Sequence, residues 1–254
     1  MGDTGSPIKL EFETDAGIGR RATLGVIVLE TDETLEPEFQ RIMGLPGVAL
    51  YHSRIPMVSS IHPETLAQME RDLPASTNLF PKCANFDVIG YGCTSGSSVI
   101  GSDRVAQAIK AERPAAQVTD PLAALIAAGK AVSAVRLGFL TPYVPEVSAR
   151  MRQRLVEADF DVPVLASFEE GDDRVVARIT EASIERAAVA VAETEGCDAI
   201  VISCTNLRCL NVIPRLEDRL GIPVLSSNQA LAWHMLRLAG VKDRLPQFGR
   251  LFEC

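Results

Sequence analysis

The sequence lacks the features that mark membrane, secreted and nucleic-acid-binding proteins. No uncharged apolar run approaches the ~20 residues that a membrane-spanning helix needs. The opening residues, MGDTGSPIKL, do not combine a basic start with an apolar stretch, so we expect no secretory signal. A net charge of −8 argues against nucleic acid and anionic membrane as partners, because both need clustered Lys and Arg. We therefore expect a cytoplasmic protein whose thiols are reduced.

Metal and nucleotide motifs are also missing. Six cysteines occur without any Cys-x-x-Cys pair, and the three histidines stand far from them, whereas zinc sites usually need closely spaced ligands. GIGR and GYGCTSG do not give the G-x-G-x-x-G spacing of dinucleotide sites, and no G-x-S-x-G nucleophile elbow occurs. We therefore expect neither a metal nor a cofactor.

An internal repeat is present instead. DVIGYGCTSGSS at 87–98 aligns with DAIVISCTNLRC at 198–209, so that Cys93 matches Cys204. LGVIVL from Leu24 matches LGFLTP from Leu137 at nearly the same spacing. Two matches at nearly one spacing indicate an internal duplication.

Each half alternates short apolar runs with amphipathic segments, which indicates parallel sheets covered by helices on both faces. We expect an α/β fold with two similar doubly wound parallel-sheet domains, related by a pseudo-twofold axis, and an active site in the cleft between them. The first domain is expected to comprise residues 1–118 and 226–254, and the second residues 119–225. Strands are expected to begin at Leu24 and Leu137 and to lie at 48–57, 87–92, 161–168, 198–203 and 222–227. Helices are expected at 62–80, 97–112, 145–158, 172–195, 211–220 and 228–240, the last with Ser227 or Asn228 as N-cap.

Cys93 and Cys204 both stand at the carboxyl end of an expected strand, where open α/β sheets bind ligands. Small polar residues that suit a helix N-terminus follow each cysteine, and free backbone N–H groups there can hold a carboxylate. The same positive helix end is expected to lower the pKa of both thiols. Two facing thiols fit proton transfer at a carbon next to a carboxylate, or covalent addition to a double bond. The alternative is that both cysteines are ordinary core residues.

The loops GCTSGS and SCTNLR, with LGVIVLETDETLEPE and IPVLSSNQALAW, resemble the Asp/Glu racemase superfamily. The resemblance is to the branch of the maleate cis-trans isomerases and arylmalonate decarboxylases, closest to its ectoine-utilisation members. It implies that Cys93 and Cys204 are catalytic and that Tyr143, in LTPY, contacts the substrate. Because the decarboxylases keep only the second cysteine, the presence of both favours an isomerase or racemase. The resemblance also implies a homo-oligomer.

Two positions depart from the isomerase pattern. Asp32, in LETDET, stands where the isomerases carry an asparagine that binds a substrate carboxylate, and Asp173 matches a second such asparagine by a looser alignment. An ionised aspartate at ~4 Å would repel a carboxylate by roughly 1 kcal/mol in water and by more in a closed cleft. We therefore expect a substrate that brings an ammonium group, such as an amino acid. The alternative is that Asp32 and Asp173 only cap helices or turns.

Together these features predict a cofactor-independent two-cysteine isomerase or racemase acting on a small carboxylate, such as an amino acid or its derivative, with Cys93 and Cys204 as the catalytic pair. The residues expected to bind the substrate are Thr31, Asp32, Thr94, Ser95, Tyr143, Asp173, Thr205, Asn206 and Asn228. Three alternatives stay open: a maleate cis-trans isomerase, an arylmalonate-type decarboxylase that uses Cys204, and a non-catalytic metabolite-binding module.

Overall fold

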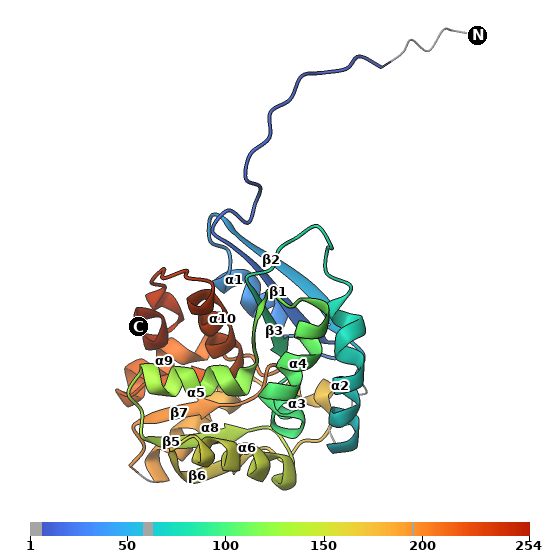
Figure 1. Cartoon of the computed structure of the whole chain (residues 1–254). Coiled ribbons are helices and arrows are strands. Elements are labelled where there is room, and N and C mark those ends of the chain that lie inside the picture. The colour runs from blue at the N-terminus through green and yellow to red at the C-terminus, as the bar shows by residue number, and fades with distance from the viewer. Residues whose placement is uncertain (1–6, 58–62, 195) are drawn as a thin grey trace, which may run out of the picture.

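Two four-stranded parallel sheets form the centre of the molecule (Figure 1). The computed structural model describes residues 7–57, 63–194 and 196–254. The first sheet has the order β2-β1-β3-β4 and contains β1 (Ala22–Leu29), β2 (Val48–Ile55), β3 (Val88–Gly92) and β4 (Gln117–Thr119). The second has the order β6-β5-β7-β8 and contains β5 (Arg136–Thr141), β6 (Asp161–Ser167), β7 (Ala199–Ile202) and β8 (Val224–Ser226). This arrangement confirms the predicted α/β fold class with parallel sheets.

The internal duplication is visible in the structure as well as in the sequence. Both sheets have the same strand order, and an aspartate at the start of each cysteine-bearing strand plays the same role. The Asp87 carboxylate accepts a hydrogen bond from the backbone N–H of Thr23 (2.8 Å), and the Asp198 carboxylate accepts one from the N–H of Arg136 (2.9 Å). The repeated sequence therefore specifies the same pairing of two central strands twice.

Helices cover the sheets, and the central strands are buried on both faces. Every residue of β3 and β7 is buried, which explains why these strands read as continuous apolar runs. The helices are α1 (Leu35–Ile42), α2 (Pro63–Thr77), α3 (Thr94–Ile100), α4 (Ser102–Glu112), α5 (Pro121–Ala131), α6 (Pro145–Glu157), α7 (Asp173–Val176), α8 (Glu181–Thr194), α9 (Val212–Leu220) and α10 (Ser227–Leu238), followed by the 3₁₀ turns η1 (Pro246–Phe248) and η2 (Arg250–Glu253).

Two predicted helices are each divided in the structure. The helix predicted at 97–112 consists of α3, which begins directly after Cys93, and α4, because Gly101 adopts φ +91°, a conformation that other residues rarely adopt. The helix predicted at 172–195 consists of α7 and α8. Its division is explained by Thr180, whose side chain accepts a hydrogen bond from the backbone N–H group of Ser183 at the start of α8, whereas Asp172 caps the start of α7. Residues 62 and 195, at the ends of two predicted helices, lie outside the described residues.

Other differences concern capping and two helices that the sequence reading missed. The N-cap of α10 is Ser226, one residue before the predicted Ser227, and it forms a capping box with Gln229. α5 was not predicted because its sequence, PLAALIAAGKA, is apolar on nearly every side and shows no helical alternation. α1 was not predicted either, since its first residues continue the segment LGVIVLETDETLEPE, which begins with the first predicted strand.

α10 connects the two sheets. It begins at the end of β8 and packs against α1, α5 and β3 of the first sheet (Figure 1). The predicted domain boundaries, at 118 and 225, stay a prediction.

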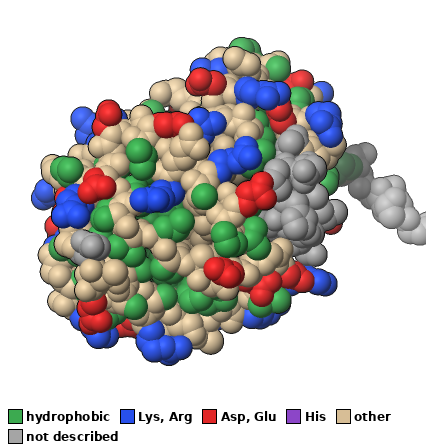
Figure 2. All heavy atoms as spheres, turned by 90° about the horizontal axis from the view of Figure 1, so that it is seen from below, with side chains coloured by type: hydrophobic (Ala, Val, Ile, Leu, Met, Phe, Trp, Pro, Cys, Tyr) green, Lys and Arg blue, Asp and Glu red, His purple; other side chains and the backbone are tan. Residues whose placement is uncertain are grey.

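No helix within the described ranges is long and apolar enough to cross a membrane. On the face seen in Figure 2, acidic and basic side chains are interspersed and do not form a patch of one sign.

Candidate active site

The two cysteines lie at the ends of equivalent strands. Cys93 directly follows β3 and is the N-cap of α3, and Cys204 follows β7. Their exposed fractions are only 1% and 2%. The Thr205 hydroxyl donates to the Gly92 carbonyl (3.4 Å), so the loop of Cys204 touches the strand that carries Cys93. The fold therefore brings both predicted catalytic residues to one buried place between the sheets.

Hydroxyl and backbone N–H groups surround the Cys93 thiol. Its Sγ accepts a hydrogen bond from the Gly96 backbone N–H (3.2 Å), lies 3.6 Å from the Ser95 hydroxyl, and interacts with the Tyr91 hydroxyl. Burial nevertheless raises the pKa of the Cys93 thiol to about 11, because desolvation outweighs these donors.

The Cys204 thiol has fewer donors and more negative neighbours. Its Sγ accepts a hydrogen bond from the Asn206 backbone N–H (3.3 Å) and interacts with the Tyr143 hydroxyl. Burial raises its pKa well above the usual range, and the nearby carboxyl groups of Asp173 and Asp32 raise it further. The prediction that helix N-termini lower the pKa of both thiols is therefore wrong for this structure. One backbone N–H group per thiol does not offset complete burial, with Asp173 near both thiols and Asp32 near Cys204, and within the described residues no helix begins directly after Cys204.

Tyr143 and Asp173 are each placed against both cysteines. Burial raises the pKa of the Tyr143 hydroxyl well above its usual range, and both thiols, Cys204 and Cys93, raise it further. The carboxyl group of Asp173 in turn raises the pKa of both thiols. The structure thus brings these four predicted residues together.

Asp32 binds the backbone just before α1 with one oxygen and leaves the other without a hydrogen bond among the described residues. Its Oδ1 accepts from the backbone N–H groups of Thr34 and Leu35, both at 2.8 Å. Its buried Oδ2 has no hydrogen-bond partner among the described residues. The nearby Thr205 hydroxyl interacts with this carboxyl group but donates its hydrogen to Gly92. Burial raises the pKa of Asp32 to about 6.

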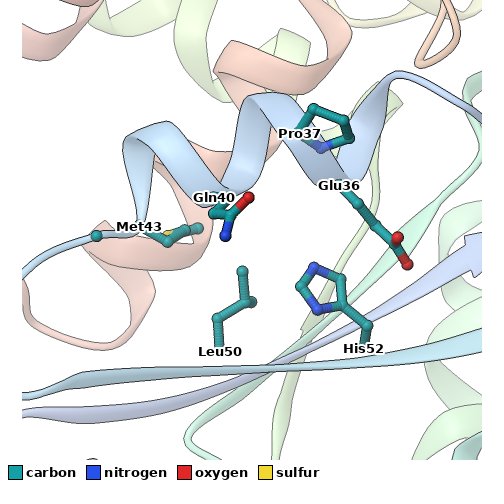
Figure 3. A pocket seen from close by; sticks show the side chains of 7 residues that line it. Glu36, Pro37, Gln40, Met43, Leu50 and His52 are labelled. Atoms are coloured by element: carbon teal, nitrogen blue, oxygen red, sulfur yellow. The ribbon is translucent and has the colours of Figure 1, made fainter.

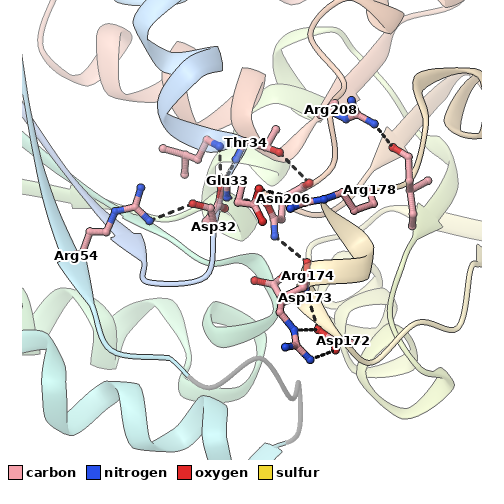
Figure 4. A network of polar contacts seen from close by, with 12 residues as sticks. Asp32, Glu33, Thr34, Arg54, Asp172, Asp173, Arg174, Arg178, Asn206 and Arg208 are labelled. Atoms are coloured by element: carbon pink, nitrogen blue, oxygen red, sulfur yellow. Dashed lines mark hydrogen bonds and ion pairs between the residues drawn. The ribbon is translucent and has the colours of Figure 1, made fainter.

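Asp173 and Asn206 join the loops of the two sheets (Figure 4). The Thr31 hydroxyl donates to Oδ2 of Asp173 (2.5 Å), and burial raises the pKa of this carboxyl group. The Asn206 side chain donates to the Asp173 carbonyl (3.0 Å) and accepts from the Glu33 N–H (2.9 Å). The predicted substrate donor Asn206 therefore already holds two loops in place with its side chain.

The cations near these acids are directed elsewhere (Figure 4). Arg54 donates to three backbone carbonyls, including that of Asp32, and pairs with Glu36 (2.9 Å). Arg174 pairs with the half-buried Asp172, and Arg178 pairs with the exposed Glu33. Within the described ranges, no Lys or Arg forms an ion pair with the carboxylate of Asp32 or Asp173, and no cluster of His, Cys, Asp or Glu is placed to bind a metal.

The sequence reading missed Glu38, a buried acid of α1. Its Oε1 accepts from the backbone N–H groups of Cys209 and Leu210, both at 2.8 Å, and its Oε2 accepts from the Asn228 amide (2.9 Å). Asn228 also donates to the Thr205 carbonyl (2.7 Å). Burial raises the pKa of Glu38 to about 7. The available signal was its position on the apolar face of α1, at helical spacing with the buried residues on either side.

Thr94 and Ser95, the remaining predicted residues, are buried in the first turn of α3. The Thr94 hydroxyl donates to Ser227 (2.8 Å) at the start of α10, and Ser95 faces the Cys93 thiol.

A separate open pocket of about 490 Å³ lies between α1 and β2 (Figure 3). Its lining includes Glu36, Gln40 and His52 but none of the predicted site residues.

Comparison with known proteins identifies the family. The family profile described as arylmalonate decarboxylase matches residues 97–252, which is more than half of the chain. This chain belongs to the arylmalonate decarboxylase and maleate isomerase family. The family assignment agrees with the predicted resemblance, whereas nothing in the comparisons supports the narrower ectoine-utilisation subgroup.

Individual members of the family match over different lengths. A maleate isomerase of Pseudomonas putida is 25% identical over 243 residues, which cover 91% of this chain and 96% of that protein. An arylmalonate decarboxylase of Bordetella bronchiseptica is 34% identical over 127 residues, 49% of this chain and 52% of that protein. The structure of a Nocardia farcinica maleate cis-trans isomerase, a cysteine-to-serine mutant with a covalently bound succinylcysteine intermediate, is 26% identical with a TM-score of 0.79 and covers 91% of this chain and 98% of that one. These family relationships are consistent with the predicted isomerase.

Proposed function

We propose that this family member is a cofactor-independent two-cysteine isomerase or racemase whose substrate is a small carboxylate with a cationic amino group, such as an amino acid or its derivative. The observation that carries the proposal is a pair of buried acids, Asp173 beside both thiols and Asp32 beside Cys204, with no cationic partner among the described residues. A second carboxylate in this place would be repelled, whereas an ammonium group would satisfy the free Oδ2 of Asp32.

The raised pKa values of the thiols support a cationic substrate in a second way. Asp173 raises the pKa of both Cys93 and Cys204, so an ammonium group bound to it would lower both. Substrate binding would thereby produce the thiolate that the reaction needs. Without a bound ammonium group, both thiols would stay protonated between turnovers.

The proposed reaction transfers one proton across the substrate. A thiolate on one face removes the proton from the carbon next to the carboxylate and becomes a thiol. The thiol on the opposite face then donates its proton to the same carbon and becomes a thiolate. Backbone N–H groups at the start of α3 and the Tyr143 hydroxyl are proposed to bind the substrate carboxylate and its developing negative charge.

Maleate cis-trans isomerisation is the second candidate. It is favoured by the relatives named maleate isomerase that match 91% of this chain, and by the covalent succinylcysteine intermediate of the Nocardia farcinica isomerase. The decarboxylase and binding-module alternatives are less favoured: the first needs only Cys204, and the second does not account for two matched thiols. Membership in the ectoine-utilisation branch stays a hypothesis that the amino-acid substrate would support.

Proton NMR in D₂O tests the proposal. The protein is incubated with small amino acids, diaminobutyrate derivatives and dicarboxylates, including maleate. Loss of one α-proton signal as deuterium enters an amino acid is the expected result. Conversion of maleate to fumarate with no exchange in any amino acid would instead establish the second candidate, and no change in any compound would favour a binding module.

The ionisation of Asp32 predicts a pH dependence for a cationic substrate. Because the pKa of Asp32 is raised to about 6, its carboxylate is charged above this pH and becomes neutral below it. We expect kcat/KM to fall as the pH decreases through about 6, since this parameter reports groups of the free enzyme. Asp32→Asn should have a low kcat/KM at all pH values and should lack the inflection near 6. An unchanged inflection in this variant would assign it to another group.

A further inference from the structure

We propose that the Tyr91 hydroxyl is a positioning donor for Cys93, which turns from the sulfur of Met69 to the sulfur of Cys93 when that thiol loses its proton. The inference rests on the proposed function in one respect, that Cys93 acts as a thiolate. Tyr91 was not among the predicted site residues.

Tyr91 is held behind Cys93 by a weak partner. It lies in β3, two residues before Cys93, and is completely buried. Its hydroxyl donates to Sδ of Met69 in α2 over 3.3 Å. A thioether is a weak acceptor, so the free energy lost when the hydroxyl leaves it is small, whereas a hydrogen bond to a thiolate is charge-assisted.

Gly96 shows how closely the three groups converge. A methyl group added at its Cα would lie 2.5 Å from the Tyr91 hydroxyl oxygen, 2.9 Å from Cys93 Sγ and 3.0 Å from Cε of Met69. The Gly96 N–H, which donates to this sulfur, and the Tyr91 hydroxyl therefore meet in a space that no larger residue could share. Interaction with Tyr91 lowers the pKa of Cys93 against the effect of burial.

The second cysteine, Cys204, has its tyrosine hydroxyl from a different position in the fold. In the internal repeat the residue equivalent to Tyr91 is Ile202, so β7 supplies no hydroxyl to Cys204. Cys204 instead interacts with Tyr143, from the loop after β5. Each cysteine thus has one tyrosine hydroxyl, from non-equivalent positions, and only the third tyrosine of the chain, Tyr51, stands elsewhere. The internal duplication does not account for two tyrosines at non-equivalent positions. A requirement for one hydroxyl donor at each thiol does account for them.

The test measures the reactivity of each thiol without substrate. Wild-type protein and Tyr91→Phe are treated with methyl methanethiosulfonate, a small thiol reagent, at several pH values between 7 and 9, and labelling of Cys93 and Cys204 is followed separately by peptide mass spectrometry. Loss of one hydrogen bond to a charged group should make labelling of Cys93 about tenfold slower or more. Labelling of Cys204 should not change, which provides an internal control.

Two further variants separate the proposed role from a purely structural one. Tyr51→Phe removes a hydroxyl from a half-buried tyrosine that packs against Phe86, and it should leave Cys93 unchanged. Met69→Leu removes the competing acceptor, so labelling of Cys93 should be as fast as in the wild type or faster. A reagent-free check is the Cβ chemical shift of Cys93 in ¹³C-cysteine-labelled protein at pH 10, which should move toward the thiolate position in wild type but not in Tyr91→Phe.

Equal labelling rates and equal Cβ shifts in wild type and Tyr91→Phe would overturn the inference. Slower labelling in Met69→Leu would overturn it too, since packing and not the released hydroxyl would then control Cys93. Because these readouts do not need turnover, they can support the role of Tyr91 even if the substrate panel shows no reaction.

Discussion

Replacing Cys204 with alanine is expected to lower the rate of isomerisation by about 10³-fold or more, and Cys93→Ala should have an effect of the same size. Each thiol is proposed to carry the proton on one face of the substrate, so neither can replace the other. The double variant should be about as slow as either single variant, because loss of either thiol already interrupts the proton transfer. Turnover of the substrate found by the NMR panel is the measurement.

Cys209→Ala is the matched control. Cys209 is as deeply buried as Cys204 and lies five residues further along the same loop, but it is not among the residues predicted to act on the substrate. Its replacement should lower the free energy of unfolding by about 1 kcal/mol and leave the turnover within a few-fold of wild type. If Cys93→Ala stays active while Cys204→Ala does not, the reaction is of the decarboxylase type, in which only the second cysteine is needed.

The second large effect is expected for Glu38→Gln. Glu38 accepts hydrogen bonds from Cys209, Leu210 and Asn228 and so holds the loop that follows Cys204 against the first sheet. In glutamine one of these oxygens becomes an NH₂ group that faces buried N–H donors. Leaving one such donor unsatisfied is expected to lower the free energy of unfolding by about 1–3 kcal/mol, as measured by urea denaturation.

The displaced loop should also affect catalysis. Because Asn228 connects Glu38 to the Thr205 carbonyl, we expect kcat to fall in Glu38→Gln while Cys93 keeps its wild-type reactivity toward the thiol reagent. Glu36→Gln provides the control on the same helix, since Glu36 forms a partly exposed ion pair with Arg54 that is worth about 0–1 kcal/mol. Equal stability of both variants would contradict the role assigned to Glu38.

The fold could be predicted from the sequence because its signals are local and repeated. The apolar runs at 87–92 and 198–203 are strands buried on both faces, and their aspartates specify the same pairing twice. The residues at which helices begin and end were harder to predict. The positive φ of Gly101 and the side chain of Thr180 divide two segments that look helical throughout.

The electrostatics of the site could not be predicted from the sequence. A cysteine at a helix N-terminus was expected to have a lowered pKa, but complete burial has the opposite effect, to which Asp173 adds at both thiols and Asp32 at Cys204. Burial depends on tertiary packing, and the two acids come from loops 141 residues apart in the chain. Glu38 was missed for the same reason, since it acts on a segment that only the folded chain brings close, whereas Tyr91 lies two residues before Cys93 within an apolar strand.

The most direct test of the central claim, two thiols acting on opposite faces of one substrate, is deuterium incorporation from each pure enantiomer in D₂O. Wild-type protein should place deuterium at the α-carbon of both enantiomers and interconvert them. Cys93→Ala and Cys204→Ala should each fail to interconvert them, and each should exchange the α-proton of only one enantiomer, a different one for each variant. Exchange of the same enantiomer by both variants, or interconversion by either one, would contradict the two-thiol account.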